Sequence, residues 1–211
     1  MSDKIRTLLF TIVVTAVFTF LVSGINAALK GRIELNRTVA RQKVILSLFG
    51  LVSAEKPVAE SAIPALFAAE TEPVKFVGNA VFECYRRKNS TEELFVFAFS
   101  GQGFWDNIVG FLAVDTQSMQ VKGIEFTNHG ETPGLGGRIS EPEFKARFRD
   151  KPFANIRPDG LRLRLVAEGS ATRPDEVDGI TGATGTSSAL EKIVNTALAK
   201  FLTQKQGGIS N

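Results

Sequence analysis

The pattern of apolar positions begins with a long uninterrupted run. Residues 7–29 contain no charged side chain, and Arg6 and Lys30 bound the run on either side. At about 1.5 Å of rise per residue, a helix of this length spans the roughly 30 Å hydrocarbon core of a membrane. The alternative is a cleaved signal peptide, because small residues gather at positions 23–28, but the apolar part of such a peptide usually has about 7 to 15 residues. We therefore expect a single-pass membrane anchor.

Two shorter helical patterns follow the anchor, and the chain then changes to strand-like runs. Residues 37–52 (RTVARQKVILSLFGLV) predict a juxtamembrane helix, and residues 56–67 (KPVAESAIPALF) predict a second short one. From Phe76 onward, aromatic and β-branched runs alternate with turn-forming stretches, which is typical of strands joined in chain order. The expected strands cover residues 76–85, 94–99, 108–114 and 121–126.

The remainder of the chain mixes helical and strand patterns. Residues 142–148 (PEFKARF) predict a short helix, and the alternation in residues 161–166 (LRLRLV) predicts a strand with one apolar face. Apolar side chains then recur at steps of three and one, as on an amphipathic helix that lies on a sheet. This stripe consists of Leu190, Ile193, Val194, Ala197, Leu198, Phe201 and Leu202. The polar tail after Thr203 is expected to be frayed.

These elements together predict an α+β fold with a mostly antiparallel sheet packed by helices. With 211 residues, the chain can form one sizeable domain and an appendage. We expect residues 1–30 to form an N-terminal cytoplasmic stub and a transmembrane helix, and residues 31–72 a juxtamembrane helical segment. Residues 73–211 then form one compact domain.

Composition removes several classes of function. The net charge is only +3 and the basic residues are scattered along the chain, which argues against nucleic acid as a partner. The single cysteine, Cys84, excludes an internal disulfide, a thiolate-held iron–sulfur cluster and a paired redox motif, and its mid-strand position suggests a buried, inert thiol. The single histidine, His129, excludes a multi-histidine metal site. We expect no metal, and any redox chemistry would need an organic cofactor.

Two glycine-rich runs are the candidate chemical sites. Residues 178–192 (DGITGATGTSSALEK) lack the lysine of a phosphate-binding Walker loop, and residues 130–139 (GETPGLGGRI) lack the last glycine of a dinucleotide fingerprint. Ser188 and Glu191 form a capping-box pattern, which predicts a helix start and nothing more. The first run nevertheless offers more hydroxyls than a cap needs, and a helix N-terminus with free amides suits a phosphate. From the residues alone, both interpretations stay open.

The first run also resembles a known motif. Asp178, the stretch Thr181–Gly182–Ala183–Thr184 and then Thr186 are similar to the flavinylation motif of FMN-binding domains. In that family a flavin transferase, for which the aspartate serves recognition, splits FAD and joins the FMN phosphate to the last threonine of the motif. The resemblance therefore implies Thr186 as the covalent acceptor. A second hallmark of the family, ETPGLG, stands at residues 131–136, directly after His129 and Gly130.

Over nearly its whole length the chain resembles the C subunits of the sodium-translocating NADH:quinone reductase. The stretches around Trp105 (GQGFWDNIVGFLAVD) and RQKVILSLFGLV carry this resemblance, although Gly185 stands where a larger apolar residue is common. It implies an electron-transfer subunit with covalent FMN and no catalytic residue of its own, which does not turn over alone. Its partners would be the other membrane subunits and the flavin transferase. The G subunit of the Rnf ferredoxin:NAD oxidoreductase complex and a non-redox, membrane-anchored module for a phosphate ligand are the alternatives.

The resemblance and the chemistry of a flat aromatic ring give a set of expected FMN-binding residues. Trp105 and Leu135 would form apolar walls, and Glu131, Thr132 and the glycine turn would meet the ring edge. Trp105 could equally be a core residue and Glu131 a solvated carboxylate, and His129 is expected to lie outside direct contact. The whole set is Thr186, Thr184, Ala183, Gly182, Thr181, Glu131, Thr132, Gly134, Leu135 and Trp105.

Two indications disagree about the orientation of the chain in the membrane. Lys4 and Arg6 precede the apolar run, whereas a larger basic group follows it, so the positive-inside rule alone would keep the large domain in the cytoplasm. The resemblance implies the opposite side, where the flavin transferase works. We expect a bacterial inner (cytoplasmic) membrane protein with its FMN domain on the periplasmic side. The basic group after the run is Lys30, Arg32, Arg37, Arg41 and Lys43.

Overall fold

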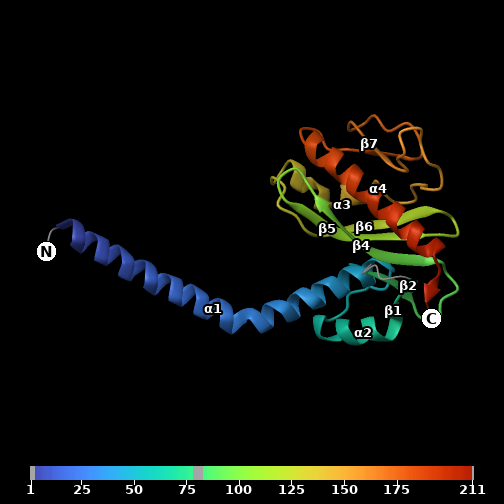
Figure 1. Ribbon diagram of the computed structural model, residues 1–211. Helices are drawn as coiled ribbons and strands as arrows, with labels where there is room; N and C mark the ends of the chain where they lie inside the picture. Colours follow the sequence, from blue (N-terminus) through green and yellow to red (C-terminus); the bar gives the residue numbers. More distant parts are fainter. Residues whose placement is uncertain (1–2, 78–82, 211) are drawn as a thin grey trace. The chain divides into compact units, whose positions relative to one another are not determined.

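The computed structural model describes residues 3–77 and 83–210 of the chain. The chain divides into two compact units, Met1–Ala40 and Arg41–Asn211. Figure 1 shows the order of the helices and strands along the chain.

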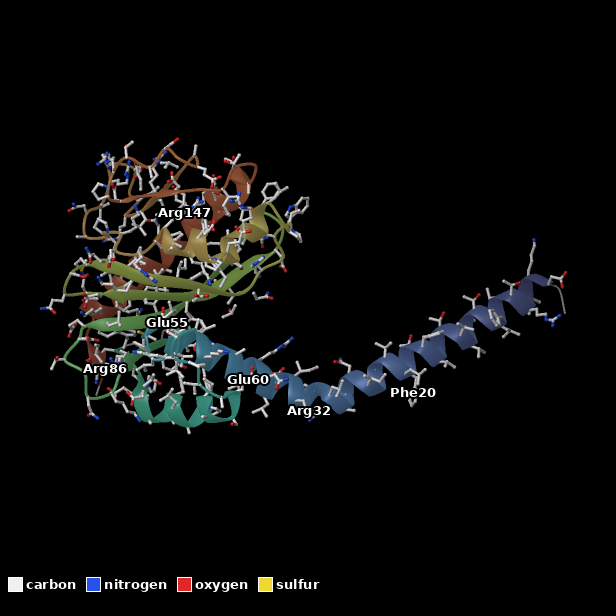
Figure 2. All side chains as sticks on the ribbon, turned by 180° about the vertical axis from the view of Figure 1, so that it is seen from behind. Phe20, Arg32, Glu55, Glu60, Arg86 and Arg147 are labelled. Atoms are coloured by element: carbon white, nitrogen blue, oxygen red, sulfur yellow. The ribbon has the colours of Figure 1, made fainter. Side chains whose placement is uncertain are left out.

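The N-terminal unit consists of helix α1 (Asp3–Leu48), whose last turns belong to the second unit. Its apolar side chains face outward: Phe10 is 69% exposed and Phe20, labelled in Figure 2, is 78% exposed. Within the described residues this is the one helix long and apolar enough to cross a membrane. The two helices expected at residues 7–29 and 37–52 are one element, because the intervening residues 30–36 hold mostly good helix formers and no proline.

The centre of the second unit is a five-stranded antiparallel sheet in the order β1-β3-β4-β5-β6. The meander of four expected strands is confirmed, but the first of them is shorter than expected. It begins at Cys84, and part of its expected range, residues 78–82, lies outside the described residues. The strands are β1 (Thr71–Pro73), β3 (Cys84–Arg87), β4 (Leu94–Gln102), β5 (Asn107–Asp115) and β6 (Gln120–Asn128).

Both faces of this sheet are covered, which explains why its strands are nearly continuous in apolar residues. On β4, Phe95, Phe97 and Phe99 pack in a core with helix α4 (Thr184–Gln206). Val96 and Ala98 point the other way, because successive side chains of a strand alternate between faces. Figure 1 shows α4 on one side of the sheet, with α2 (Ile63–Glu70) and the last turns of α1 on the other. The predicted α+β class is confirmed.

A second core lies on the face of the sheet opposite α4, and it bears on the expected domain boundaries. Ile45 and Phe49 are buried against Val96 and Phe111 of the sheet, and the guanidinium of Arg41 lies 5.3 Å from the centre of the Phe111 ring. The segment expected to be a separate juxtamembrane region from residue 31 to residue 72 is therefore divided. Its part from residue 41 onward, which includes a short 3-10 helix η1 (Glu60–Ala62), belongs to the compact domain, because its apolar side chains cover a sheet face that would otherwise be exposed.

The segment between β6 and α4 forms two short helices and two short strands. The expected strand at residues 161–166 is limited to three residues and pairs in parallel with the strand that precedes α4. Arg162 and Leu163 leave the ladder because their backbone amides donate to the side-chain oxygen of Asn195, at 2.6 and 3.1 Å. The elements are η2 (Gly136–Ser140), α3 (Pro142–Ala146), β7 (Arg164–Val166) and β8 (Glu176–Asp178).

Helix α4 buries the predicted apolar stripe, from Leu190 to Phe201, with Leu202 partly buried at its margin. The expectation of a frayed tail after Thr203 is wrong. The helix continues to Gln206, and strand β9 (Ile209–Ser210) then pairs antiparallel with β2 (Lys75–Phe76). Lys205 also reaches back to the carboxylate of Glu93 at 2.7 Å, so the tail is held by contacts with residues distant in sequence.

Candidate functional site at the start of helix α4

The loop between β8 and α4 brings the first glycine-rich run to the start of the helix. Gly182 has a φ of +78°, a backbone conformation that favours glycine, and Ala183 is the N-cap residue. Among the described residues, no side chain caps this helix. The expected capping box is therefore wrong: Ser188 lies inside the helix, and the Glu191 carboxylate accepts the backbone amide of Leu165 at 2.6 Å.

The hydroxyl groups of this run divide into two sets. Thr181, Thr184 and Ser188 are exposed, whereas Thr186 and Ser187 are buried. Ser187 accepts a hydrogen bond from the backbone amide of Ile180 at 3.2 Å, so it fastens the loop to the first turn of the helix. None of these hydroxyl groups caps the helix, and the backbone amides of its first turn are available to bind an anion.

Thr186 is joined to the second glycine-rich run through one carboxylate. Its hydroxyl donates to Oε2 of Glu131 at 2.5 Å, and the two residues are only 3% and 4% exposed. The other oxygen, Oε1, accepts the backbone amide of Trp105 at 3.0 Å. The structure thus brings together three segments that are far apart in sequence: the turn between β4 and β5, the ETPGLG run and the start of α4. The open alternative of a solvated Glu131 is excluded.

The electrostatics of Glu131 favour its charged form. Burial works against ionisation, but hydrogen bonds from the Thr186 hydroxyl and from the amides of Trp105, Asp106 and Phe104 outweigh it, so the pKa of Glu131 lies below its usual value. Glu131 is therefore a buried, ionised hydrogen-bond acceptor at neutral pH. Its contact with the edge of a flavin ring stays a prediction.

Two glycines make this close packing feasible. A Cβ on Gly136 would press against the Thr186 hydroxyl and lie 2.9 Å from Oε2 of Glu131. A Cβ on Gly103 would lie 2.5 Å from Oε1 of the same carboxylate. Within the ETPGLG run, Gly136 thus allows the close packing around Glu131, whereas Gly134, with a φ of +73°, serves the turn.

Exposed apolar side chains surround the start of the helix. Phe104, Trp105 and Leu135 are 59%, 67% and 46% exposed, and the Phe104 and Trp105 rings meet edge to face at 5.3 Å. Phe104 lies against Gly185, where a Cβ would clash with its ring, and Leu135 lies 3.2 Å from where a Cβ on Gly182 would be. Trp105 is therefore not a core residue. Phe104 was missed by the sequence reasoning, although its place beside Trp105 in a turn could have indicated it.

Arg147 and Glu168, two residues outside the predicted FMN-binding set, form a brace that holds the loop before α4. Arg147, labelled in Figure 2, donates to the backbone carbonyls of Asp178 and Gly179 at 3.1 and 2.6 Å. It also pairs with Glu168 at 2.7 Å, and Glu168 in turn accepts the amide of Thr181 at 3.1 Å. The hydrogen bond from Arg147, followed by those from Thr181, lowers the pKa of Glu168 to about 2. Neither residue belongs to a glycine motif, so no local pattern indicated this pair.

The remaining predicted residues lie as follows. The carboxylate of Asp178 accepts the backbone amides of Ser170 and Ala171, both at 2.9 Å, so its side chain stabilises the adjacent loop. Thr132 is exposed, and its carbonyl accepts amides of the glycine turn. His129 is hydrogen-bonded to the Ser140 hydroxyl at 2.8 Å. Cys84 is buried, and desolvation raises the pKa of its thiol, as expected for an inert cysteine.

A surface groove of about 450 Å³ runs beside the first turns of α4. It is also lined by the end of β4 and by Phe104 of the turn that follows this strand. The helix side is lined by Gly185, Ser188, Lys192 and Thr196. The start of α4 therefore borders a surface groove to which the exposed Phe104 contributes.

Comparison with known proteins gives both a family match and full-length relatives. Residues 103–199 match the family of FMN-binding domains, and this range contains the Thr186–Glu131 pair and its surroundings. The C subunit of the Na(+)-translocating NADH-quinone reductase of Pseudomonas aeruginosa is 27% identical, with 92% of this chain and 91% of that protein covered. The corresponding protein of Yersinia pestis is 26% identical, with 92% and 88% covered.

A solved structure agrees in fold. The crystal structure of the C subunit from Parabacteroides distasonis superimposes with a TM-score of 0.65, at 22% identity, over 81% of this chain and 93% of that one. By sequence over nearly its whole length, and by fold, the chain thus resembles the C subunits of the Na(+)-translocating NADH-quinone reductases, and its residues 103–199 match the FMN-binding domain family.

Proposed function

We propose that this chain is a membrane-anchored electron-transfer subunit that carries FMN as a phosphoester on Thr186. The observation that carries the proposal is the place of Thr186. Its hydroxyl lies in the uncapped first turn of α4, is hydrogen-bonded to Glu131 and falls within the match to FMN-binding domains, and the exposed Phe104 lies against the adjacent Gly185. A helix N-terminus with free amides is suited to a phosphate group.

The residues present fit an FMN group. The amides of the first turn and the exposed hydroxyl of Thr184 can hold the phosphate, and glycine at position 136 leaves the space that the Thr186 hydroxyl and Glu131 need. Phe104, Trp105 and Leu135 offer apolar surface for a flat ring. When bound, FMN supplies one- and two-electron transfer, and the protein supplies attachment, orientation and burial.

Thr184 is the competing acceptor, since it lies on the same turn and is more exposed than Thr186. The order of residues in the flavinylation motif favours Thr186, and so does its hydrogen bond to a carboxylate, which Thr184 lacks among the contacts of the described residues. Attachment at Thr186 requires its hydroxyl to become accessible, because the residue is only 3% exposed.

The complex and the partners are inferred from the relatives. Their names specify an NADH-quinone reductase that translocates Na⁺, which favours this complex over the Rnf complex. We infer that the chain works with the other membrane subunits, receives FMN from a flavin transferase and does not turn over alone. Helix α1 would be the single membrane span, in a bacterial inner membrane, with the second unit on the periplasmic side.

The test is whether the denatured chain carries flavin. The chain is produced with an active flavin transferase, purified, denatured on a gel and examined for flavin fluorescence, and the modified peptide is identified by its mass. We expect a fluorescent band and a flavin on the peptide that contains Thr186. A dark band would reject the electron carrier and favour a module that binds a phosphate ligand without covalent attachment.

A further inference from the structure

The carboxylate of Glu131 lies at the point where a proton must leave Thr186 when its hydroxyl forms an ester. We propose that Glu131 is the general base for this attachment, so that the chain contributes a catalytic group to its own modification. The inference rests on the proposed function, because it requires Thr186 to be the acceptor of the flavin phosphate.

The geometry of the pair is that of a nucleophile and its base. The Thr186 hydroxyl donates directly to Oε2 of Glu131 at 2.5 Å, within the reach expected of a general base. The second oxygen, Oε1, is held by the backbone amide of Trp105, so the carboxylate has a fixed orientation. Other protein systems use the same arrangement, since the catalytic carboxylate of protein kinases accepts the proton of the attacking hydroxyl.

Burial and packing make the arrangement specific. Both side chains are more than nine-tenths buried, and Gly136 and Gly103 let the backbone approach each side of the carboxylate. Hydrogen bonds from Thr186 and then from the backbone amides hold the pKa of Glu131 below its usual value, so the carboxylate is in the ionised form that a base requires.

The chemical step balances as follows. The Oγ of Thr186 forms a bond to the phosphorus of the FMN half of FAD, which the flavin transferase presents. The bond from that phosphorus to the oxygen of the adenylate half breaks, and AMP leaves with the electron pair. The proton of the Thr186 hydroxyl passes to Oε2 of Glu131 and from there to solvent. No oxidant or reductant is required.

The test compares two substitutions that separate a base from a connecting residue. Glu131→Gln keeps the size of the side chain and a carbonyl that accepts backbone amides, but it cannot take the proton. Glu131→Asp keeps a carboxylate but shortens the side chain. Glu143→Gln is the matched control, because Glu143 is an exposed residue of α3. Each full-length variant, in detergent, is mixed with FAD and excess flavin transferase, and covalent flavin is followed by intact mass.

A general base predicts the order wild type, then Glu131→Asp, then Glu131→Gln, with the maximal rate of Glu131→Gln lower by about 100-fold or more. The concentration of chain at half-maximal rate should change little, and Glu143→Gln should match wild type. If Glu131 only connects the loops, Glu131→Gln should acquire flavin faster than Glu131→Asp, because glutamine preserves the length of the side chain and aspartate does not. Thermal melting of each variant reports whether the fold is kept.

The outcomes separate the inference from the proposed function. If wild type carries flavin on Thr186 and Glu131→Gln acquires it at the same rate, the base assignment is wrong and the function stands. A rate for Glu131→Asp below that of Glu131→Gln would also overturn the assignment. If wild type acquires no flavin on Thr186, the proposed function itself fails.

Discussion

Arg147 and Glu168 form an ion pair at 2.7 Å that connects the end of α3 to the loop from which α4 begins. Arg147 donates at the same time to the carbonyls of Asp178 and Gly179, and Glu168 accepts the amide of Thr181. The backbone on both sides of Gly179 is therefore fixed by charged side chains. We expect this pair to position the helix start on which the proposed attachment depends.

Removing Arg147 should weaken the domain. Arg147→Ala leaves two partly buried carbonyls and the Glu168 carboxylate without their donor, and we expect the free energy of unfolding to fall by about 2 kcal/mol. Chemical unfolding followed by circular dichroism measures this. Arg149→Ala, at an exposed neighbour, should change it by less than about 0.5 kcal/mol. Equal effects of the two substitutions would contradict the role of the brace.

The pH dependence of stability should reflect Glu168. Its pKa is about 2 in the folded protein, against 4.5 for an unperturbed glutamate. Because the folded value is the lower one, the stabilisation is complete above the unfolded pKa and is lost as the pH falls from 4.5 toward 2. We expect Glu168→Gln to have a flatter decline in its denaturation midpoint over this range, whereas Glu143→Gln should follow wild type. Parallel curves for all three proteins would count against the assignment.

The acceptor assignment gives a third prediction. Thr186→Val should abolish covalent flavin, and Thr184→Val should retain it. The structure also predicts that Thr186→Val lowers the free energy of unfolding by about 1 to 3 kcal/mol, because a buried oxygen of Glu131 loses its donor. Flavin fluorescence after denaturation and the mass of the peptide test the attachment. Retention of flavin in Thr186→Val and its loss in Thr184→Val would reverse the assignment.

Asn195 gives a fourth prediction, which concerns the fold alone. Its side chain accepts the amides of Arg162 and Leu163 and donates to the carbonyls of Leu163 and Glu191. Asn195→Leu removes these bonds and leaves buried amides without partners, so we expect a loss of about 3 kcal/mol in unfolding free energy.

The neighbouring Thr196→Ala is the matched control for Asn195→Leu, since Thr196 is an exposed residue of the same helix. It should unfold within about 0.5 kcal/mol of wild type. A stable Asn195→Leu variant would mean that β7 does not depend on this side chain.

Local patterns predicted much of the fold. The aromatic and β-branched run of β4 and the spacing of apolar residues from Leu190 to Phe201 reflect the residue preference of a strand and the period of a helix, and both can be seen in the sequence. The uncharged run at residues 7–29 likewise needs no tertiary information. The same reasoning failed at the boundaries of elements. The capping box at Ser188 and the frayed tail after Thr203 were wrong, because contacts with distant residues control both.

The order of residues was enough to indicate the class of the fold, the long apolar run at residues 7–29 and the two glycine-rich runs, and its resemblance to FMN-binding domains indicated Thr186. Three features became visible only in the folded chain: Thr186 donates to Glu131 across 55 positions of sequence, Arg147 braces the loop, and Trp105 is exposed. The physical reason is that the periods of helices and strands arise from neighbours within a few residues. A buried hydrogen bond between two loops depends instead on how the sheet and the helix pack.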